Sequence, residues 1–145
     1  MAPDANFPGM RKQELDTPAL LVDLDVMEAN ISRMARFPSR KRAKLRPHYK
    51  THKTPAIALK QLEAGAIGIT CAKVEEAETL VNAGVKDILI ANQVVGSTKI
   101  ARLAGLARHA GLMVAGASLR VLVERWASSA GEAPAPTPSS PPSQA

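Results

Sequence analysis

The pattern of apolar and polar positions in the middle of the chain alternates between two periods. Three short, mainly apolar runs predict buried strands: 67–72, 87–92 and 112–115. Between these runs, two segments place apolar side chains at helical spacing and end at a glycine: 74–83 and 97–110. Strands that are apolar on both faces and alternate with helices are typical of successive βαβ units with parallel strands. We therefore predict an α/β fold.

The segment before this repeat starts with a further apolar run. Residues 19–25 are rich in aliphatic side chains and predict a strand. Residues 26–37 then carry apolar side chains at helical spacing and predict a helix. Pro38 is expected to end that helix, because the residue before a proline disfavours helical geometry.

A second strand and helix follow a basic stretch. Residues 44–49 predict a strand, and Pro47 places it at an edge, a bulge or a strand end because proline has no N–H to donate. Thr54 and Pro55 form a favourable helix start, with threonine as the N-cap and proline at the first helical position. Gly65 is expected to end this helix.

The two ends of the chain differ from this pattern. We divide the chain into an irregular lead-in (1–17), the α/β domain (18–117), a further helix (118–130) and a tail (131–145). The tail contains five prolines and no large apolar side chain. Such a segment buries too little surface to offset the entropy of ordering it, so we predict that it is disordered.

Size and composition exclude several classes of protein. The 145 residues are too few for a complete (β/α)₈ barrel, which needs about 250. Aromatic residues make up 3% of the chain, which disfavours stacking on single-stranded nucleic acid. The single cysteine excludes an internal disulfide and a multi-cysteine zinc site, and it suits a reducing compartment. With no apolar run of about 18 residues and no signal-like start, we expect a cytoplasmic protein without a membrane partner.

The net charge of +6 is concentrated in one part of the chain. Nine lysines and arginines lie between Arg33 and Lys53, and no acidic residue interrupts them. This run is a surface for nucleic acid or an acidic partner, a solvated helix end and loop, or an attraction for an anionic ligand such as a phosphate ester. Because no nucleic-acid motif accompanies the charge, we predict no nucleic-acid partner.

The densest group of chemically useful side chains lies at residues 46–53, where a strand ends and a helix begins. In parallel α/β folds, this end of the strands is where ligands bind. Alternation along a continuing strand would put His48, Lys50 and His52 on one side. A neutral lysine amine forms a Schiff base with an aldehyde, and the alternative is a solvated loop. Thr70, near the end of the next strand, faces the same site or the edge of the core.

Four stretches carry a resemblance to a known family: LDTPALLVDLDVMEANISRM, RPHYKTHK, TCAKVEEAE and DILIANQVVG. Together they make the chain between Glu14 and Val114 similar to the N-terminal region of the D-threonine aldolase and D-serine dehydratase group. These enzymes depend on pyridoxal phosphate and have the alanine racemase-like fold. The resemblance implies a partial (β/α) barrel of the alanine racemase N-terminal type, with about four barrel strands: 44–49, 68–72, 87–91 and 112–115. The run 19–25 would then join a second, β-rich domain.

The resemblance also implies roles for individual residues. The family carries its cofactor on the first lysine of RPHxKTHK, which is Lys50, and this lysine would also act as a base or proton shuttle. Lys53 is the competing candidate, although it falls at the probable helix start. His48 and His52 would orient Lys50 or the cofactor ring, and Thr70 would face the cofactor. The implied activity is lyase chemistry on D-β-hydroxy amino acids, with an aldolase preferred over a dehydratase.

Parts that the family uses elsewhere are missing from this sequence. The later barrel strands that hold the phosphate and the ring nitrogen, and the C-terminal domain with the divalent metal ligands, have no counterpart here. We therefore expect no metal site, and a family-like homodimer stays an open alternative. We hypothesise a reading-frame shift in the gene between about Val114 and Leu119, where the composition changes. Two other functions stay open: a non-catalytic fragment, and a small basic binding module.

Other polar residues receive structural interpretations. Glu75, Glu76 and Glu78 are expected to form a solvated helix face. Cys71 is expected to be a small buried apolar residue rather than a nucleophile.

Overall fold

A computed structural model describes residues 9–39 and 43–116, together with Glu124 and Ala127. The elements in chain order are two 3₁₀ turns, four helices and three strands within these residues: η1 (Lys12–Glu14), α1 (Leu24–Ser39), η2 (Tyr49–Thr51), α2 (Pro55–Glu63), β1 (Ile69–Cys71), α3 (Val74–Asn82), β2 (Asp87–Ile90), α4 (Ser97–Leu106) and β3 (Gly111–Val114). The further helix expected over 118–130 and the disordered tail expected over 131–145 lie outside the described residues, apart from Glu124 and Ala127.

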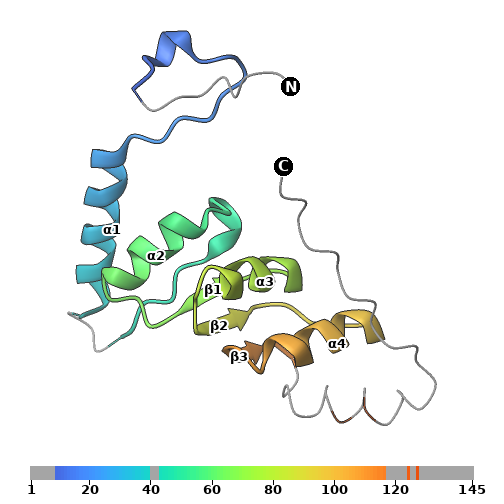
Figure 1. The fold of residues 1–145 in the computed structure, drawn as a ribbon. Helices are drawn as coiled ribbons and strands as arrows, with labels where there is room; N and C mark the ends of the chain where they lie inside the picture. Colours follow the sequence, from blue (N-terminus) through green and yellow to red (C-terminus); the bar gives the residue numbers. More distant parts are fainter. Residues whose placement is uncertain (1–8, 40–42, 117–123, 125–126, 128–145) are drawn as a thin grey trace.

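The strands form a parallel sheet in the order β1-β2-β3, with α3 and α4 as the crossovers (Figure 1). Thr70, Leu89 and Met113 are aligned across the three strands, so their side chains share one face of the sheet. The neighbouring positions point to the opposite face and pack against the helices. The predicted α/β architecture with successive βαβ units is confirmed, and the strands are shorter than the apolar runs that predicted them.

The core lies between the sheet and the helices that follow each strand. Ile69 and Cys71 of β1, with Ile88 and Ile90 of β2, are completely buried. They pack in one cluster with apolar side chains of α2, α3 and α4: Ala58, Val74, Ala77, Leu80 and Leu103. The opposite face of the sheet has less cover, since Met113 is 43% exposed.

The predicted strand over 44–49 is reduced to a single contact. His48 forms an isolated parallel bridge with Thr70, next to a hydrogen bond of 2.8 Å from the Thr70 N–H to the Pro47 carbonyl. The segment is extended and runs beside β1, as expected. Pro47 cannot donate to a further rung of the ladder, and the chain turns into η2 at Tyr49. Both features limit the pairing to one bridge.

The predicted strand over 19–25 is wrong. Residues 19–23 have no regular secondary structure, and α1 begins at Leu24, where the Asp23 carboxylate accepts the Val26 N–H at 3.0 Å. A strand needs a neighbour to satisfy its backbone groups, and none lies beside this segment among the described residues. Leu20 is accordingly 94% exposed. The helix predicted over 26–37 is present as the longer α1, which includes Pro38 in its last turn.

The helix ends confirm most of the expected boundary residues. Thr54 occupies the N-cap of α2 with Pro55 following, although the Thr54 hydroxyl donates to the His52 carbonyl at 2.7 Å and does not cap the helix. Gly65 after α2 has a positive φ of 103°, a conformation that favours glycine. At α4 the N-cap is Gly96, so Ser97 is the first helical residue.

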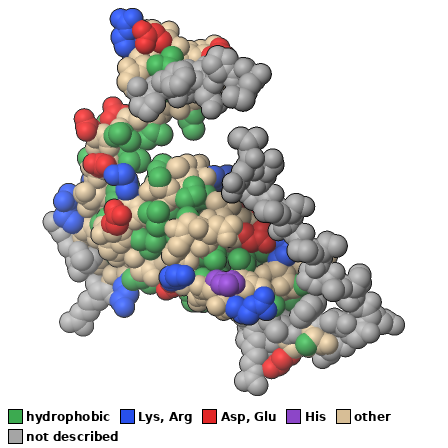
Figure 2. Space-filling model, viewed as in Figure 1, with side chains coloured by type: hydrophobic (Ala, Val, Ile, Leu, Met, Phe, Trp, Pro, Cys, Tyr) green, Lys and Arg blue, Asp and Glu red, His purple; other side chains and the backbone are tan. Residues whose placement is uncertain are grey.

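Helix α1 lies along one side of the molecule beside α2, away from the sheet (Figure 1). Figure 2 shows hydrophobic side chains at the surface along the segment that leads into α1. In the part of the chain that the structure describes, no helix has the length and apolar character that a membrane span requires.

Candidate functional site

Lys50 lies in the turn η2, immediately after the bridge between His48 and Thr70. The turn is held by backbone-directed bonds: the His48 Nδ1 accepts the Lys50 N–H at 3.2 Å, and the Thr51 hydroxyl donates to the His48 carbonyl at 3.2 Å. Tyr49 is buried beneath the turn at 2% exposure, whereas Lys50 is exposed. Among the described residues no ion pair engages the Lys50 ammonium. The turn therefore presents a free amine at the carboxyl end of the sheet.

His48 and Thr70 are brought together by the bridge, as their predicted place at one site requires. The Thr70 side chain is largely buried, and its hydroxyl donates to the Arg46 carbonyl at 3.4 Å. This bond joins β1 to the extended segment before Lys50. Thr70 thus has a position at the edge of the core, which was the alternative to a cofactor contact.

His52 does not lie on the same side as His48 and Lys50 through strand alternation, because strand geometry ends at His48 and the turn η2 follows. Its Nδ1 accepts the Thr54 N–H at 3.1 Å, and its ring meets Tyr49 edge-on with centroids 5.3 Å apart. Burial lowers the pKa of His52, and smaller contributions from Thr54 and the Gln61 side chain raise it. Burial also raises the pKa of Tyr49, with a further contribution from the Glu76 carboxylate.

Lys53, the competing lysine, has a different environment from Lys50. Its φ of 47° is left-handed, and its Nζ lies 3.8 Å from the Glu76 carboxylate. Glu76 is buried, and its other oxygen accepts the Ala72 N–H at 2.8 Å. Lys53 therefore takes part in a contact between the loop that follows η2 and the first turn of α3.

Glu76 was expected on a solvated face of its helix, and this expectation is wrong because the side chain is buried. Its neighbours Glu75 and Glu78 pair with Arg102 of α4, at 3.2 Å from Arg102 Nη1 and 2.6 Å from Arg102 Nε respectively. The acidic residues of α3 thus join neighbouring elements. Cys71 is buried as expected, and burial raises the pKa of its thiol to about 12.

Arg46 links the lysine segment to the second strand of the sheet. Its guanidinium holds the Asp87 carboxylate in a two-pronged contact, Nη1 to Oδ1 at 2.8 Å and Nη2 to Oδ2 at 3.1 Å. The guanidinium lies over Gly68, just before β1, where a Cβ would collide with it and would lie 2.6 Å from the Asp87 carbonyl oxygen. A glycine is required here because of this close approach.

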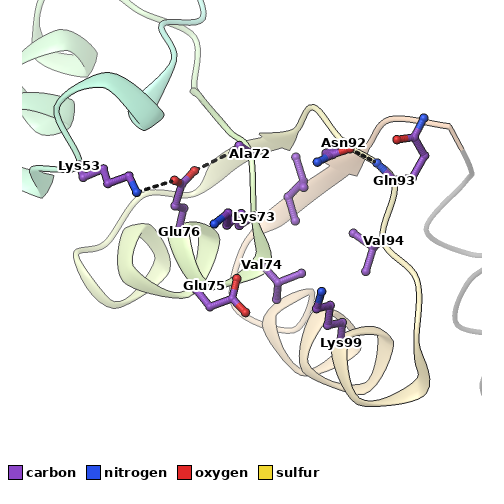
Figure 3. A pocket seen from close by; sticks show the side chains of 11 residues that line it. Lys53, Ala72, Lys73, Val74, Glu75, Glu76, Asn92, Gln93, Val94 and Lys99 are labelled. Atoms are coloured by element: carbon purple, nitrogen blue, oxygen red, sulfur yellow. Dashed lines mark hydrogen bonds and ion pairs between the residues drawn. The ribbon is translucent and has the colours of Figure 1, made fainter.

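A cavity of about 500 Å³ opens beside Lys53 and Glu76, at the carboxyl ends of β1 and β2 (Figure 3). Three lysines line it, Lys53, Lys73 and Lys99, together with Glu76 and Asn92. Lys50 is not among its lining residues. Lys73 and Lys99 were not predicted from the sequence as site residues, although each lies at the start of a helix that follows a strand.

These features define a class of protein: a parallel α/β unit with an exposed lysine at the carboxyl end of its first extended segment. The chain matches the family of the alanine racemase N-terminal domain over residues 22–138, and it belongs to that family. The match extends past Val114, where the resemblance in the sequence fades. Proteins of this family use pyridoxal phosphate.

Among individual proteins, the chain is similar to the D-threonine aldolase of Arthrobacter sp, with 50% identity over 107 residues. That match covers 74% of this chain and 28% of the aldolase. The D-threo-3-hydroxyaspartate dehydratase of Delftia sp. is 48% identical over 77 residues, which cover 53% of this chain and 20% of the dehydratase.

Solved structures give the same result for the fold. The crystal structure of the D-threonine aldolase from Filomicrobium marinum superposes with a TM-score of 0.73 at 45% identity, over 81% of this chain and 32% of that one. The chain therefore spans less than a third of the length of these relatives. The predicted partial barrel of the alanine racemase N-terminal type is confirmed.

The residues at the Lys50 turn fit one end of the family cofactor. An exposed primary amine at the carboxyl end of the sheet is the group that an aldehyde requires, and no ion pair among the described residues competes for it. In the same described residues, no cluster of three histidine, cysteine or acidic side chains could hold a metal ion.

Proposed function

We propose that this chain forms the cofactor-lysine portion of a pyridoxal phosphate-dependent lyase that acts on D-β-hydroxy amino acids. The observation that carries the proposal is the exposed Lys50 amine, held at the carboxyl end of the sheet by a hydrogen-bonded turn. Its support is the 50% identity to a D-threonine aldolase.

The Lys50 amine would hold the cofactor at its aldehyde carbon, with loss of water, until the amino group of a substrate takes its place. Pyridoxal phosphate, when bound, supplies an electron sink for the pair left on the substrate Cα. The released Lys50 amine would then hold or deliver a proton at Cα on its own side of the substrate. In aldol cleavage the β-hydroxyl would lose its proton as the Cα–Cβ bond breaks and an aldehyde leaves, and the proton at Cα would then replace the broken bond.

His48 and Thr70 would form the wall of the site next to Lys50. His48 fixes the Lys50 backbone through its Nδ1, and Thr70 fixes the segment before it through the Arg46 carbonyl. Both would act on the position of the amine. Contact between either side chain and the cofactor stays a prediction.

Dehydration is the second candidate reaction, and the 48% identity to a D-threo-3-hydroxyaspartate dehydratase favours it. A dehydratase would use the same Lys50 amine to remove the proton from Cα, after which the β-hydroxyl leaves as water. Aldol cleavage is preferred because the match to the aldolase covers more of the chain, 74% against 53%.

We further propose a small-molecule D-amino acid as partner, a cytoplasmic location and no nucleic-acid binding. The basic run does not form one free surface, because Arg46 pairs with Asp87 and Lys53 lies beside Glu76. The single cysteine is buried and would stay reduced. A steep loss of nucleic-acid binding with salt would instead support the basic binding module.

Cofactor attachment is the direct test of Lys50. The chain is mixed with pyridoxal phosphate, the visible absorbance of the lysine-bound cofactor is recorded, and borohydride trapping with peptide mapping locates it. We expect attachment at Lys50, its loss in Lys50→Ala, and little change in the matched control Lys53→Ala. Absorbance that is indifferent to Lys50→Ala would overturn the proposal.

Activity is tested separately, because the chain spans 28% of the related aldolase. D-Threonine and D-threo-3-hydroxyaspartate are supplied with and without manganese, and the products are identified. Glycine with an aldehyde indicates cleavage, and a keto acid with ammonia indicates dehydration. Attachment without turnover would identify the chain as a cofactor-binding portion that needs further residues for catalysis.

A further inference from the structure

Two buried polar atoms near the Lys50 turn lack hydrogen-bond partners. They are the Nε2 of His52 and the Oε1 of Gln61 on α2. The Gln61 side chain acts on the His52 ring, whose pKa it raises against the effect of burial. Buried polar atoms without partners are costly, and a ring N–H and an amide oxygen are complementary. A small rotation of the Gln61 amide would join them.

The backbone determines which ring nitrogen of His52 carries the hydrogen. The Nδ1 accepts the Thr54 N–H at 3.1 Å, so its lone pair is used and it bears no hydrogen. In a neutral imidazole the hydrogen then lies on Nε2. This is the tautomer that can donate to Gln61.

His52 also contacts the turn that carries Lys50. Its ring packs edge-on against Tyr49, and its backbone N–H donates to the Tyr49 carbonyl. The next residue, Lys53, donates its N–H to the same carbonyl at 2.9 Å and so closes the turn around Lys50. Single 3₁₀ turns have little stability of their own, so a side chain that joins this turn to α2 would fix its position.

We propose that His52 is a positioning residue for Lys50: a neutral imidazole that donates from Nε2 to the Gln61 Oε1 and accepts from Thr54, and so holds the Lys50 turn against α2. This inference deepens the proposed function and rests on Lys50 as the attachment point. It assigns His52 no contact with the cofactor, because its Nε2 is buried beside Gln61.

Two variants separate the two bonds of the ring. In His52→Asn the short amide can still accept the Thr54 N–H as asparagine does in an Asx turn, but it cannot extend to Gln61. In His52→Gln the longer amide can still donate to Gln61. Gln61→Leu removes the acceptor while it keeps a side chain of similar size. His109→Asn, at an exposed histidine whose backbone carbonyl accepts a hydrogen bond from Lys86 Nζ, is the matched control.

Nitrogen-15 NMR of the full chain reads the tautomer without any cofactor. We expect a neutral His52 with the hydrogen on Nε2, and faster hydrogen exchange of the Lys53 amide by about tenfold in His52→Asn and in Gln61→Leu, as the loss of one buried hydrogen bond implies. The double variant should be no worse than either single one, because both remove the same bond. A hydrogen on Nδ1, or independent additive effects, would overturn the inference.

Borohydride trapping then connects the bond to the lysine. We expect the rate of pyridoxal phosphate attachment at Lys50, relative to the other lysines, to fall about tenfold in His52→Asn and Gln61→Leu. It should fall less in His52→Gln and stay unchanged in His109→Asn. If the unaltered chain shows no attachment at Lys50, the proposed function fails while the NMR result on the His52–Gln61 bond still stands. Normal attachment in both variants would show that His52 does not position Lys50.

Discussion

The βαβ repeat that contains β1, β2 and β3 and the segment that leads into α1 are similarly apolar in sequence, yet their side chains have opposite environments. Leu80 of α3 and Ile88 of β2 are completely buried. Leu20 is 94% exposed and Leu24 at the start of α1 is 62% exposed. The difference lies in their neighbours, because each strand of the repeat is paired and is covered by the next helix. Apolar character alone therefore does not determine burial.

The largest expected effect on stability is at a buried side chain of the repeat. Leu80→Ala removes a completely buried side chain and leaves a cavity, so we expect unfolding to become easier by about 2–5 kcal/mol. The matched change Leu20→Ala, at an exposed site, should leave the free energy of unfolding nearly unchanged. Denaturant unfolding of both variants measures this difference, and equal effects would contradict the burial described here.

A smaller effect is expected where the lysine segment meets the repeat. In Gly68→Ala the new methyl group would collide with the Arg46 guanidinium and the Asp87 carbonyl oxygen. Overpacking of this kind costs about 1–3 kcal/mol. Thermal unfolding should show the loss, and adding Arg46→Ala should recover only the part due to the guanidinium. Full recovery would place all the strain on Arg46, contrary to the close backbone contact.

The stability of the folded chain should depend on pH through the buried ring of His52. Burial lowers the pKa of His52 in the folded chain below its ordinary value of 6.5. The unfolded chain therefore binds the proton more readily. Stability contributed by the neutral ring is therefore fully present above pH 6.5 and is lost as the pH falls below it. Unfolding measured from pH 8 to pH 5 should show a smaller loss in His52→Gln than in the unaltered chain.

The smallest effect concerns the contact between α1 and α2. Lys60 Nζ lies 2.6 Å from the Glu28 carboxylate, and both side chains are largely exposed. Exposed pairs of this kind contribute little and are screened by salt. We expect Lys60→Ala to leave the unfolding midpoint unchanged at high salt. A clear shift there would show that α1 is held more firmly than its exposure suggests.

The sequence pattern predicted the repeat well because each of its units contains local signals for the start and end of its strand and helix. Apolar runs marked the strands, and Gly65 and Gly84 marked the helix ends through their left-handed conformation. The pattern failed at 19–25, since pairing depends on a neighbour that a local pattern does not contain. It also missed the burial of Glu76, because a carboxylate that accepts the Ala72 N–H and faces Lys53 looks like any other charge in a helix.

The role of Lys50 stays a prediction, and the structure bears only on the placement of this lysine and of its neighbours. The motif and the family resemblance pointed to that lysine, and the structure exposes its amine. The place of His52 could not be read from alternation, because the turn at Tyr49 ends the strand geometry on which alternation depends. The contact between Arg46 and Asp87 joins residues far apart in sequence, so no local pattern predicts it. The need for a glycine at position 68 becomes clear only from the close approach in the structure.

The Arg46–Asp87 contact has a consequence for the length of the segment that carries the lysine. Three residues separate Arg46 from Lys50, and the first of these two is fastened to β2 while the second lies at the end of the sheet. Adding or removing one residue between them would shift the amine by about 3.3 Å along the segment. The reach of the amine is therefore determined by a residue count, and changes of length here should be tolerated far less than changes of side chain.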